Sequence, residues 1–531
     1  MILLRLTRVV MVVSAALTLA SAAAMAAEAD FDVRRFGAVE GGKALSTAAI
    51  QRAVDEAAAA GGGTVVLPPG RWLSGTVRLR SRVTLLLEAG CTLVGSTDLK
   101  DYPEQRPAVR SYTDNYVTQS LIAGEGLEGV AIRGPGCIDG SGAAFRRKEY
   151  LARPYVIRLV GCRGVLVEGV TLRDSPMWMQ HYLACEHVTI RGITVSNHVS
   201  YNNDGLDIDG CTDVSISDCR IDSDDDALCL KSTLDRPCRA VRIANCLLSS
   251  HCNALKMGTE SNGGFQDITI SNCVILAPRL SQPMYGKARG ISGIALEIVD
   301  GGRLDGVAVS NIVIRGVTVP LFMRLGNRAR PFAKDGPRPP VGTFRNVRIS
   351  HVIATEAASV GCALAGIPGH PLQDVTLSDV RLVFEGGGKR EDAARDVPEK
   401  EADYPEALMF GALPAYGLFA RHVRGLKLSG VELAAEKADA RPAIVCDDVE
   451  GLRLDGLEAA AWPGAPALVR LKDARSALLT GCRPQAPEGL FLRIEGAATR
   501  RIVLLPNDLS AAGRAVETAA DVPAGAVIRG P

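Results

Sequence analysis

The stretch YNNDGLDIDGCTDVSISDCRIDSDDDALCLKS, residues 201–232, combines two features that rarely occur together. Apolar and polar residues alternate with the period of a β-strand, as in LDID (206–209) and VSIS (214–217). Aspartates nevertheless crowd the same segment, although strands are depleted in Asp and neighbouring carboxylates repel one another. A fold that brings these carboxylates together for a chemical purpose would explain the combination.

The alternating pattern recurs along most of the chain. Each unit is a short strand, a polar or Gly turn and a second short strand. The ten units are VLVEGVTL (165–172), VTIRGITV (188–195), VSISDCRI (214–221), VRIANCLL (241–248), ITISNCVI (268–275), VAVSNIVI (307–314), VRISHVIA (347–354), VTLSDVRL (375–382), LKLSGVEL (426–433) and LRLDGLEA (452–459). Repeats of this length indicate a solenoid.

The unit length selects among solenoids. The central units leave no room for a long amphipathic helix, and they are shorter than the roughly 40 residues of a propeller blade. We therefore predict an all-β parallel β-helix of about 10 or more coils, in which equivalent residues stack about 4.8 Å apart. The predicted solenoid covers residues 27–510 as one domain, with loop insertions in the longer units, and residues 511–531 stay unassigned.

The N-terminus predicts export and a capped solenoid. Arg5 and Arg8 precede an apolar run that ends in AMA, which is typical of a signal peptide at residues 1–26, cut near Ala26. The protein would then be secreted or periplasmic. Further on, Ser46 and Thr47 can cap an amphipathic helix at about 46–60, whose apolar face includes Ile50, Val54 and Ala57.

Charge and hydropathy argue against some partners. The formal net charge of +1 becomes −1 when the two signal-peptide arginines are removed, so nothing favours nucleic acid or an anionic membrane. No other stretch is long and apolar enough to span a bilayer. We also expect a monomer that needs no cofactor.

Fourteen cysteines allow two interpretations in an exported protein. One is a disulfide framework. The other is a ladder of small side chains inside the solenoid, since free Cys packs as a small hydrophobe. The spacing favours the ladder, because Cys185, Cys211 and Cys238 each stand three residues before a strand, and Cys219, Cys246 and Cys273 are 27 residues apart.

The repeat also predicts where the aspartates lie. In register, LDIDG (206–210), LCLKS (228–232), LKMGT (255–259) and LEIVD (296–300) align as one strand of successive coils. Asp204 and Asp226 each precede this strand by two residues, so they should be neighbours, with Asp225 beside them. Three close carboxylates raise at least one pKa, which supplies a protonated acid and an ionised base for hydrolysis of a glycosidic bond.

The other aspartates have a simpler explanation. Asp is a common turn residue, and acidic turns can bind calcium. Taken singly, Asp207, Asp209, Asp213, Asp218, Asp222 and Asp224 are better explained as turn or surface residues.

The acidic segment resembles glycoside hydrolase family 28, the polygalacturonase family. The family has the motifs N-T-D-G-x-D, G-D-D and I-K-S, and this chain has NNDGLD (202–207), DD (225–226) and LCLKS (228–232) in the same order. The resemblance extends over residues 30 to about 315, where it includes FGAVEGGKALSTAAIQRAVDEA, GGGTVVLPPG and DSPMWMQHY. The resemblance implies a right-handed parallel β-helix and inverting hydrolysis without a metal. It implies that Asp225 is the general acid, that Asp204 and Asp226 hold the attacking water, and that Asn202 is the motif's Asn.

Four positions depart from the family pattern. Asp224 replaces the Gly before the aspartate pair, where we expect its charge to raise the pKa of the acid further. Cys252 stands where the family has a His, and His251 lies one position early, so it is either a displaced active-site residue or a turn residue. In the R-I-K motif that clamps a uronate, our alignment puts Glu297 at the Arg and Val299 at the Lys.

These departures shape the expected substrate. Without the clamp, we predict a pectin-type substrate other than plain homogalacturonan, either a neutral sugar or a uronate held by Lys256 and Arg324. Lys231 can contact substrate or a carboxylate, and Trp178 can stack on a sugar or pack in the core. His181 and Asn253 complete the substrate-binding candidates. Two other functions stay open on the same fold: a polysaccharide lyase, and a non-catalytic module for glycan binding or adhesion.

Overall fold

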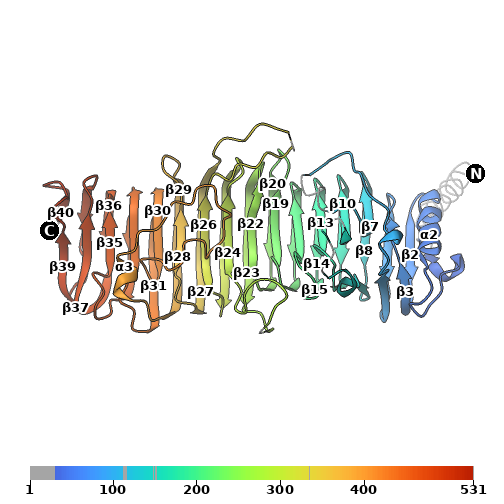
Figure 1. Cartoon of the computed structure of the whole chain (residues 1–531), viewed down its shortest axis with the longest axis horizontal. Helices are drawn as coiled ribbons and strands as arrows, with labels where there is room; N and C mark the ends of the chain where they lie inside the picture. The colour runs from blue at the N-terminus through green and yellow to red at the C-terminus, as the bar shows by residue number, and fades with distance from the viewer. Residues whose placement is uncertain are drawn as a thin grey trace, which may run out of the picture.

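The chain winds into a parallel β-helix, seen in a computed structural model that describes residues 30–111, 117–146, 149, 152–280, 282–333 and 335–529, without the side chains of 486–488. The predicted signal peptide (1–26) lies outside these ranges. Figure 1 shows the strands stacked along the long axis, with α2 (Thr47–Ala59) at the N-terminal end and β40 (Val527–Arg529) at the opposite end. Among the described residues, no helix has the length and apolar character needed to cross a bilayer.

The coils stack into three parallel ladders. Ladder A contains β1 (Asp30–Asp32), β2 (Gly63–Leu67), β5 (Val83–Leu87), β8 (Glu128–Arg133), β11 (Arg163–Glu168), β14 (Glu186–Arg191), β17 (Thr212–Ser217), β20 (Cys238–Ala244), β23 (Gly264–Leu276), β25 (Arg303–Arg315), β27 (Thr343–Ala357), β29 (Leu372–Gly386), β31 (Lys427–Lys437), β33 (Arg453–Asp455), β36 (Arg475–Thr480), β38 (Arg500–Leu504) and β40. Ladder B contains β3 (Gly70–Ser74), β6 (Cys91–Gly95), β9 (Cys137–Asp139), β12 (Thr171–Arg173), β15 (Thr194–Asn197), β18 (Arg220–Ser223) and β21 (Leu247–Ser250), and continues in the second half of β23.

Ladder C carries the site described below. It contains β4 (Val77–Arg78), β7 (Ser120–Glu125), β10 (Tyr155–Val160), β13 (Gln180–Leu183), β16 (Leu206–Asp209), β19 (Leu228–Ser232), β22 (Asn253–Ser261), β24 (Ser292–Ile298), β26 (Val319–Leu325), β28 (Cys362–Ala365), β30 (Leu418–Arg424), β32 (Ile444–Glu450), β35 (Val469–Lys472), β37 (Arg483–Glu495) and β39 (Ala512–Thr518). The remaining elements are β34 (Glu458–Ala460), α3 (Arg390–Ala393) and the 3-10 helices η1 (Val33–Phe36), η2 (Leu99–Asp101) and η4 (Gly142–Phe145).

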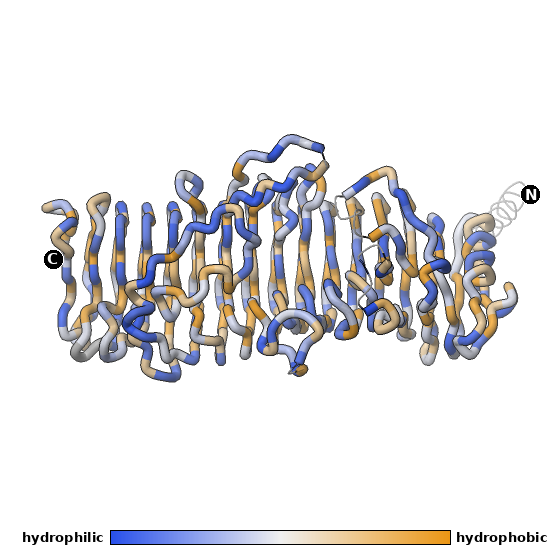
Figure 2. Tube along the Cα trace, viewed as in Figure 1, coloured by the Kyte–Doolittle hydropathy of each residue, from blue (hydrophilic) through white to orange (hydrophobic). Residues whose placement is uncertain are grey.

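The sequence repeat matches the ladder register. Val165 pairs with Val188, Val188 with Val214, and Val214 with Val241, so the first residues of successive units lie side by side. Alternate side chains point into the solenoid and form one continuous hydrophobic cluster, which the alternating colours of Figure 2 follow along the strands. Strands also form beyond residue 510, where β39 pairs with β37 and β40 with β38.

The turn between ladders A and B explains several acidic and amide residues. Asp218, Asn245, Asn272 and Asn311 occupy the same corner of successive coils, all with φ between 55° and 58°. Asn and Asp tolerate this left-handed conformation better than other side chains that carry a Cβ. Asn245 Nδ2 also donates to Asp218 Oδ1 at 3.2 Å. Asp218 is therefore a turn residue, as predicted.

Helix α2 lies where the sequence predicted a helix. Ile50, Val54 and Ala57 are fully buried, because they cover the apolar residues of the first coils. Ser46 precedes the helix but makes no capping hydrogen bond with its side chain. Its hydroxyl instead accepts from the Val39 amide at 3.0 Å, and Thr47 Oγ1 accepts from the Gly75 amide at 2.7 Å.

The cysteines form ladders rather than bridges. All fourteen are free, and thirteen of them are buried. Cys185 donates its amide to Cys211 Sγ at 3.3 Å in the next coil, and Cys219, Cys246 and Cys273 stack at a corner of the interior. Small side chains fit there because the backbone bends inward at each corner.

We expect an Ellman titration in guanidinium chloride without reductant to find all fourteen thiols. The melting temperature should be the same with and without reductant, because no cross-link restrains the unfolded chain. The native protein is the control, since burial should leave nearly all of its thiols unreactive. A titre two or more thiols below fourteen would contradict the interior ladder.

Candidate active site

The acidic residues meet at the N-terminal edge of ladder C. Asp204 precedes β16, and Asp225 and Asp226 precede β19. Because Leu206 pairs with Leu228, Asp204 lies beside Asp226 in the next coil. At least one carboxyl oxygen from each of the three aspartates lies within 4.8 Å of the others. The structure thus brings together the three residues predicted to be catalytic.

The three carboxylates line a cavity of about 300 Å³. Its other walls come from ladder C and from loops that cross over it. The lining residues are Met177, Trp178, Asn202, Asp204, Asp225, Asp226, Lys231, Lys256, Thr259, Glu260, Tyr285, Arg328, Arg330 and Tyr404. A concave polar site with carboxylates and cations is suited to binding and cleaving a sugar chain.

Two buried lysines hold the carboxylates. Lys231 Nζ lies 3.3 Å from Asp204 Oδ2 and 3.4 Å from Asp207 Oδ1, and Lys256 Nζ lies 3.0 Å from Asp226 Oδ2. Both ammonium groups remain charged: burial acts against this, but the surrounding carboxylates more than offset it and raise each pKa well above its ordinary value. Asp204 and Asp226 are therefore each anchored by a cation of their own.

Burial and mutual repulsion separate the roles of the aspartates. Burial raises the pKa of Asp204 to about 6, although Lys231 opposes this rise. Burial raises the pKa of Asp225 well above its ordinary value, and the charges of Asp204 and Asp226 add to the rise. Asp225 lacks a lysine as close as those beside the other two. It is thus the group best placed to keep a proton near neutral pH.

Three more predicted residues lie at the cavity or directly behind it. Asn202 lines the wall, where Arg153 Nη2 donates to its Oδ1 at 3.2 Å. Asn253 lies behind the wall and donates through Nδ2 to Asp226 Oδ1 at 2.7 Å. Trp178 lines the cavity with its ring 4.5 Å from Lys231 Nζ, although it is only 6% exposed. Asn253 therefore orients a carboxylate rather than facing the cavity.

Neither predicted histidine reaches the cavity. His181 is fully buried, with Nε2 3.1 Å from Asp209 Oδ2. His251 is also fully buried, and its ring faces Asp224 and the Lys287 carbonyl. Cys252 is the residue nearer the aspartates; burial raises its pKa, and Asp225 adds to the effect. The prediction of substrate contacts for His181 and His251 is therefore not supported by their positions.

The sequence alignment of LKMGT (255–259) with LEIVD (296–300) in the next coil was wrong by two residues. Leu255 pairs with Ile294, not with Leu296, so Ala295 follows Lys256 in its column. Glu297 is fully buried behind the cavity, where burial raises its pKa to about 8. A shift of two residues keeps every side chain on its face, so apolar alternation could not reveal it.

Arg324 is likewise not a substrate contact. It is 1% exposed, and its guanidinium donates to the carbonyls of Gly366, Glu399 and Lys400. It anchors the segment 387–417, which leaves β29, crosses ladder C and brings Tyr404 to the cavity. A long insertion between repeat units was visible in the sequence, but not the direction in which it folds back.

Some functional candidates come from such insertions and were not predicted. Arg328 lies in the loop after β26, with its guanidinium carbon 5.1 Å from the Tyr404 ring centroid. Its Nη1 is buried and has no hydrogen-bond partner among the described residues. Arg330 is committed to Asp300 and Glu260, at 2.8 and 3.2 Å. Both arginines follow shortly after Arg324, the residue that the sequence analysis names, which lies in β26 itself.

Several aspartates expected in turns are buried instead. Asp207 and Asp209 point outward from β16, but covering loops remove them from solvent, and each has polar partners. Asp224 is also fully buried and pairs with His198 at 2.8 Å. It points away from the cavity, so the raised pKa of Asp225 comes from burial, Asp204 and Asp226 instead.

We expect Lys231→Met to reduce the free energy of unfolding by about 3–5 kcal/mol, because it leaves the buried carboxylate of Asp204 without its cation. The midpoint of a denaturant titration measures the loss. Lys400→Met is the matched control, since Lys400 pairs with Asp403 at the surface, where an ion pair contributes about 0–1 kcal/mol. Equal midpoints for the two variants would contradict the anchoring role of Lys231.

Known proteins resemble this chain in sequence and in fold. A family model described as glycosyl hydrolases family 28 matches residues 63–402. A probable polygalacturonase of Vitis vinifera is 29% identical over 387 residues, which cover 67% of this chain and 74% of that protein. The family 28 exopolygalacturonase of Yersinia enterocolitica superposes with a TM-score of 0.63 at 19% identity, over 81% of this chain and 78% of that one. A hyperthermoactive exopolygalacturonase of Thermotoga maritima gives 0.57 at 23%, over 67% and 87%. At these identities, the two structures show a common fold.

Proposed function

Because the chain belongs to glycosyl hydrolases family 28, we propose that it hydrolyses α-glycosidic bonds in a pectin-type polysaccharide or its oligosaccharides. The observation that carries the proposal is the cavity itself, where three carboxylates meet and two lysines form ion pairs with two of them. The likeness to a probable polygalacturonase supports the choice of pectin.

The three aspartates divide the work. Asp225 donates its proton to the glycosidic oxygen as the bond breaks. Asp204 and Asp226 bind the attacking water and remove its proton. Lys231 and Asn253 keep these two carboxylates in place from behind, at 3.3 Å from Asp204 and 2.7 Å from Asp226.

We propose inversion of configuration, which the family resemblance implies. The spacing of the carboxylates is not the basis for this proposal. The two catalytic carboxyl groups are about 6.5–9.5 Å apart in inverting enzymes and about 5–5.5 Å apart in retaining enzymes. Here, one oxygen from each of the three aspartates lies within 4.8 Å of the others. In our scheme, Asp204 and Asp226 hold the water jointly, so it need not fit between an acid and a base that face each other. Proton NMR of the first anomer formed tests this, and a product of retained configuration contradicts it.

The pH dependence of kcat/KM should report the division of roles. We expect activity to fall below about pH 6, where Asp204 becomes protonated and loses its capacity as a base. Activity should also fall at high pH, once Asp225 loses the proton that burial retains. Asp225→Asn should lower kcat about 10²–10⁴-fold and abolish the alkaline limb, with an unchanged circular dichroism spectrum. A variant with near wild-type turnover would rule out Asp225 as the acid. A wild type that turns over none of the substrates would instead favour a binding module.

The products separate hydrolysis from elimination. A polysaccharide lyase would release an unsaturated uronate that absorbs in the ultraviolet, and its activity would depend on a metal that a chelator removes. Hydrolysis gives a new reducing end with no such absorbance. Chromatography of the products under both conditions decides between the two reactions.

The cavity supports a substrate with an acidic sugar at one position. Lys231, Lys256 and Arg330 are committed to protein carboxylates, whereas Arg328 has a buried donor without a protein partner among the described residues. A guanidinium binds a carboxylate through two parallel hydrogen bonds. We therefore propose Arg328, in place of Arg324, as the group that holds a uronate. We keep, as a separate proposal, the prediction that plain homogalacturonan is not the preferred substrate.

We expect Arg328→Gln to raise KM for an acidic pectic oligosaccharide about 10-fold or more, with a smaller change in kcat, because a charged hydrogen bond contributes about 1.5–3 kcal/mol. Arg338→Gln is the matched control in the same loop, because Arg338 is exposed and, within the described part of the chain, donates only to the Asn327 carbonyl. In a panel of branched pectic oligosaccharides, neutral α-linked oligosaccharides and unsubstituted oligogalacturonides, the enzyme should prefer the branched pectic ones. A strong preference for unsubstituted polygalacturonate would contradict the substrate proposal.

The remaining expectations concern the whole protein. We propose that it is exported after cleavage near Ala26, that it acts as a monomer, and that its coils wind with a right hand beneath α2 as a cap. N-terminal sequencing of the protein secreted by its natural host tests the cleavage site. Light scattering tests the oligomeric state.

A further inference from the structure

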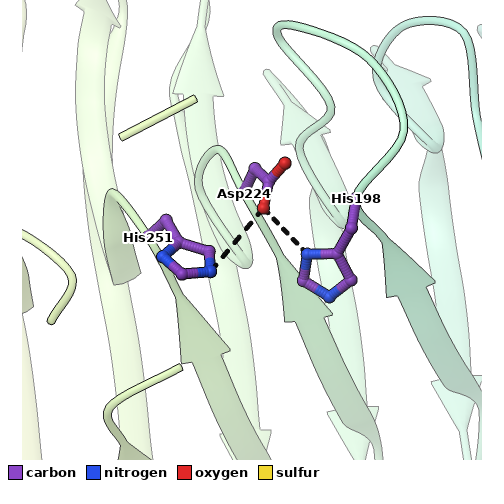
Figure 3. A group of neighbouring side chains, drawn as sticks. All are labelled: His198, Asp224 and His251. Atoms are coloured by element: carbon purple, nitrogen blue, oxygen red, sulfur yellow. Dashed lines mark hydrogen bonds and ion pairs between the residues drawn. The ribbon is translucent and has the colours of Figure 1, made fainter. Parts of the chain in front are cut away.

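A second polar cluster lies beside the catalytic turn. Asn197, Ser223 and Ser250 pair with one another in successive coils of ladder B. The residues that follow them, His198, Asp224 and His251, therefore stack in one column, as Figure 3 shows. The proposed hydrolysis assigns no role to these three side chains, because they do not line the cavity.

Both imidazole rings direct one nitrogen at the same oxygen. His198 Nδ1 lies 2.8 Å from Asp224 Oδ1, and His251 Nε2 lies 3.7 Å from it (Figure 3). Asp224 and His251 are fully buried, and His198 is 17% exposed. Two histidines and one carboxylate that converge in this way form a typical ligand set for zinc.

In each ring, the nitrogen that does not face Asp224 lies close to another oxygen atom. His251 Nδ1 lies 2.9 Å from the Lys287 carbonyl, and His198 Nε2 lies 3.4 Å from Asp222 Oδ2. A carbonyl can only accept, so Nδ1 of His251 carries a proton. Histidines that bind metals usually donate their other ring N–H to a carbonyl or a carboxylate in this way.

This tautomer leaves a problem at the other nitrogen of His251. In a neutral ring with a proton on Nδ1, Nε2 presents a lone pair, and here it faces a carboxylate oxygen. The atom is buried and has no hydrogen-bond partner among the described residues. Two acceptors that face each other in a buried site need a positive charge between them. A proton on His198 satisfies Asp224, but does nothing for His251.

The distances fit a small divalent cation. Ligand bonds of about 2.0–2.1 Å in a tetrahedral site place the donor atoms about 3.3 Å apart. The two measured separations, 2.8 and 3.7 Å, lie on either side of this value. All three donor atoms lie within 4.8 Å of one another. Small rotations of the partly exposed His198 ring would complete the geometry.

We propose that His198, Asp224 and His251 bind one Zn²⁺ ion, with Asp222 orienting His198 from behind. The ion fixes the turn that carries Asp225, while the hydrolysis itself proceeds without metal chemistry. Asp224 stands where the family motif that this segment resembles has a Gly. The proposal is independent of the proposed function, because zinc binding can be measured without any substrate.

The test uses the full-length exported chain, treated with a chelator, dialysed and titrated with zinc by calorimetry. We expect one Zn²⁺ per chain and a higher melting temperature with zinc. His198→Gln and His251→Gln should each weaken binding at least 10-fold, and Asp222→Asn about 10–100-fold, as is usual for a supporting residue. Cobalt substitution should give visible bands of a tetrahedral site in the wild type, and these bands should be lost in His251→Gln.

Two controls locate the ion. His187→Gln should bind zinc normally, because His187 is an exposed residue that pairs with Asp213 and lies outside the column. Asp225→Asn should also retain binding, which separates this cluster from the catalytic carboxylates. Failure of the wild type to bind zinc, or equal binding by the wild type and His251→Gln, would overturn the proposal. Loss of binding in Asp225→Asn alone would assign the ion to the catalytic carboxylates and overturn it too.

Discussion

In-register stacking of parallel coils is the constraint on which the rest of this structure depends. When one coil lies directly on the next, residues more than twenty positions apart in sequence become neighbours at the strand spacing of about 4.8 Å. Asp204 thereby meets Asp226, and His198 meets Asp224 and His251. The same rule builds the hydrophobic interior, the cysteine ladders and the column of Asn and Asp residues at the corner between ladders A and B.

Stacking concentrates like charges as readily as it concentrates apolar side chains, so the site needs compensation. Covering loops bury the outer face of ladder C, which removes its carboxylates from water. Lys231 and Lys256 then supply the opposing charge from positions in the same ladder, at 3.0–3.4 Å from their partners. Taking charges out of water is costly unless they are paired. The cost of burial raises the pKa of Asp225, which has no lysine as close among the described residues.

Two parts of the site show where reasoning from the repeat reaches its limit. The pairing of Leu206 with Leu228 follows from near-identical units without insertions, and so the positions of Asp204, Asp225 and Asp226 could be predicted. The pairing of Leu255 with Ile294 crosses an inserted loop, and the predicted register was wrong by two residues there. Since strands have a period of two, every side chain stays on its face after such a shift, and the pattern of apolar residues remains satisfied.

The sequence alone determined the solenoid, the order of its coils and the meeting of the three aspartates, because these follow from local alternation and a regular repeat. It also indicated free interior cysteines and a helix near Thr47–Ala59. Only the tertiary structure decided what lies above the carboxylates: Arg328 and Tyr404 enter from insertions, while Arg324 turns to backbone carbonyls, and His181 and His251 lie outside the cavity. Loops that fold back across a solenoid are placed by contacts distant in sequence, and no periodicity within the chain records those contacts.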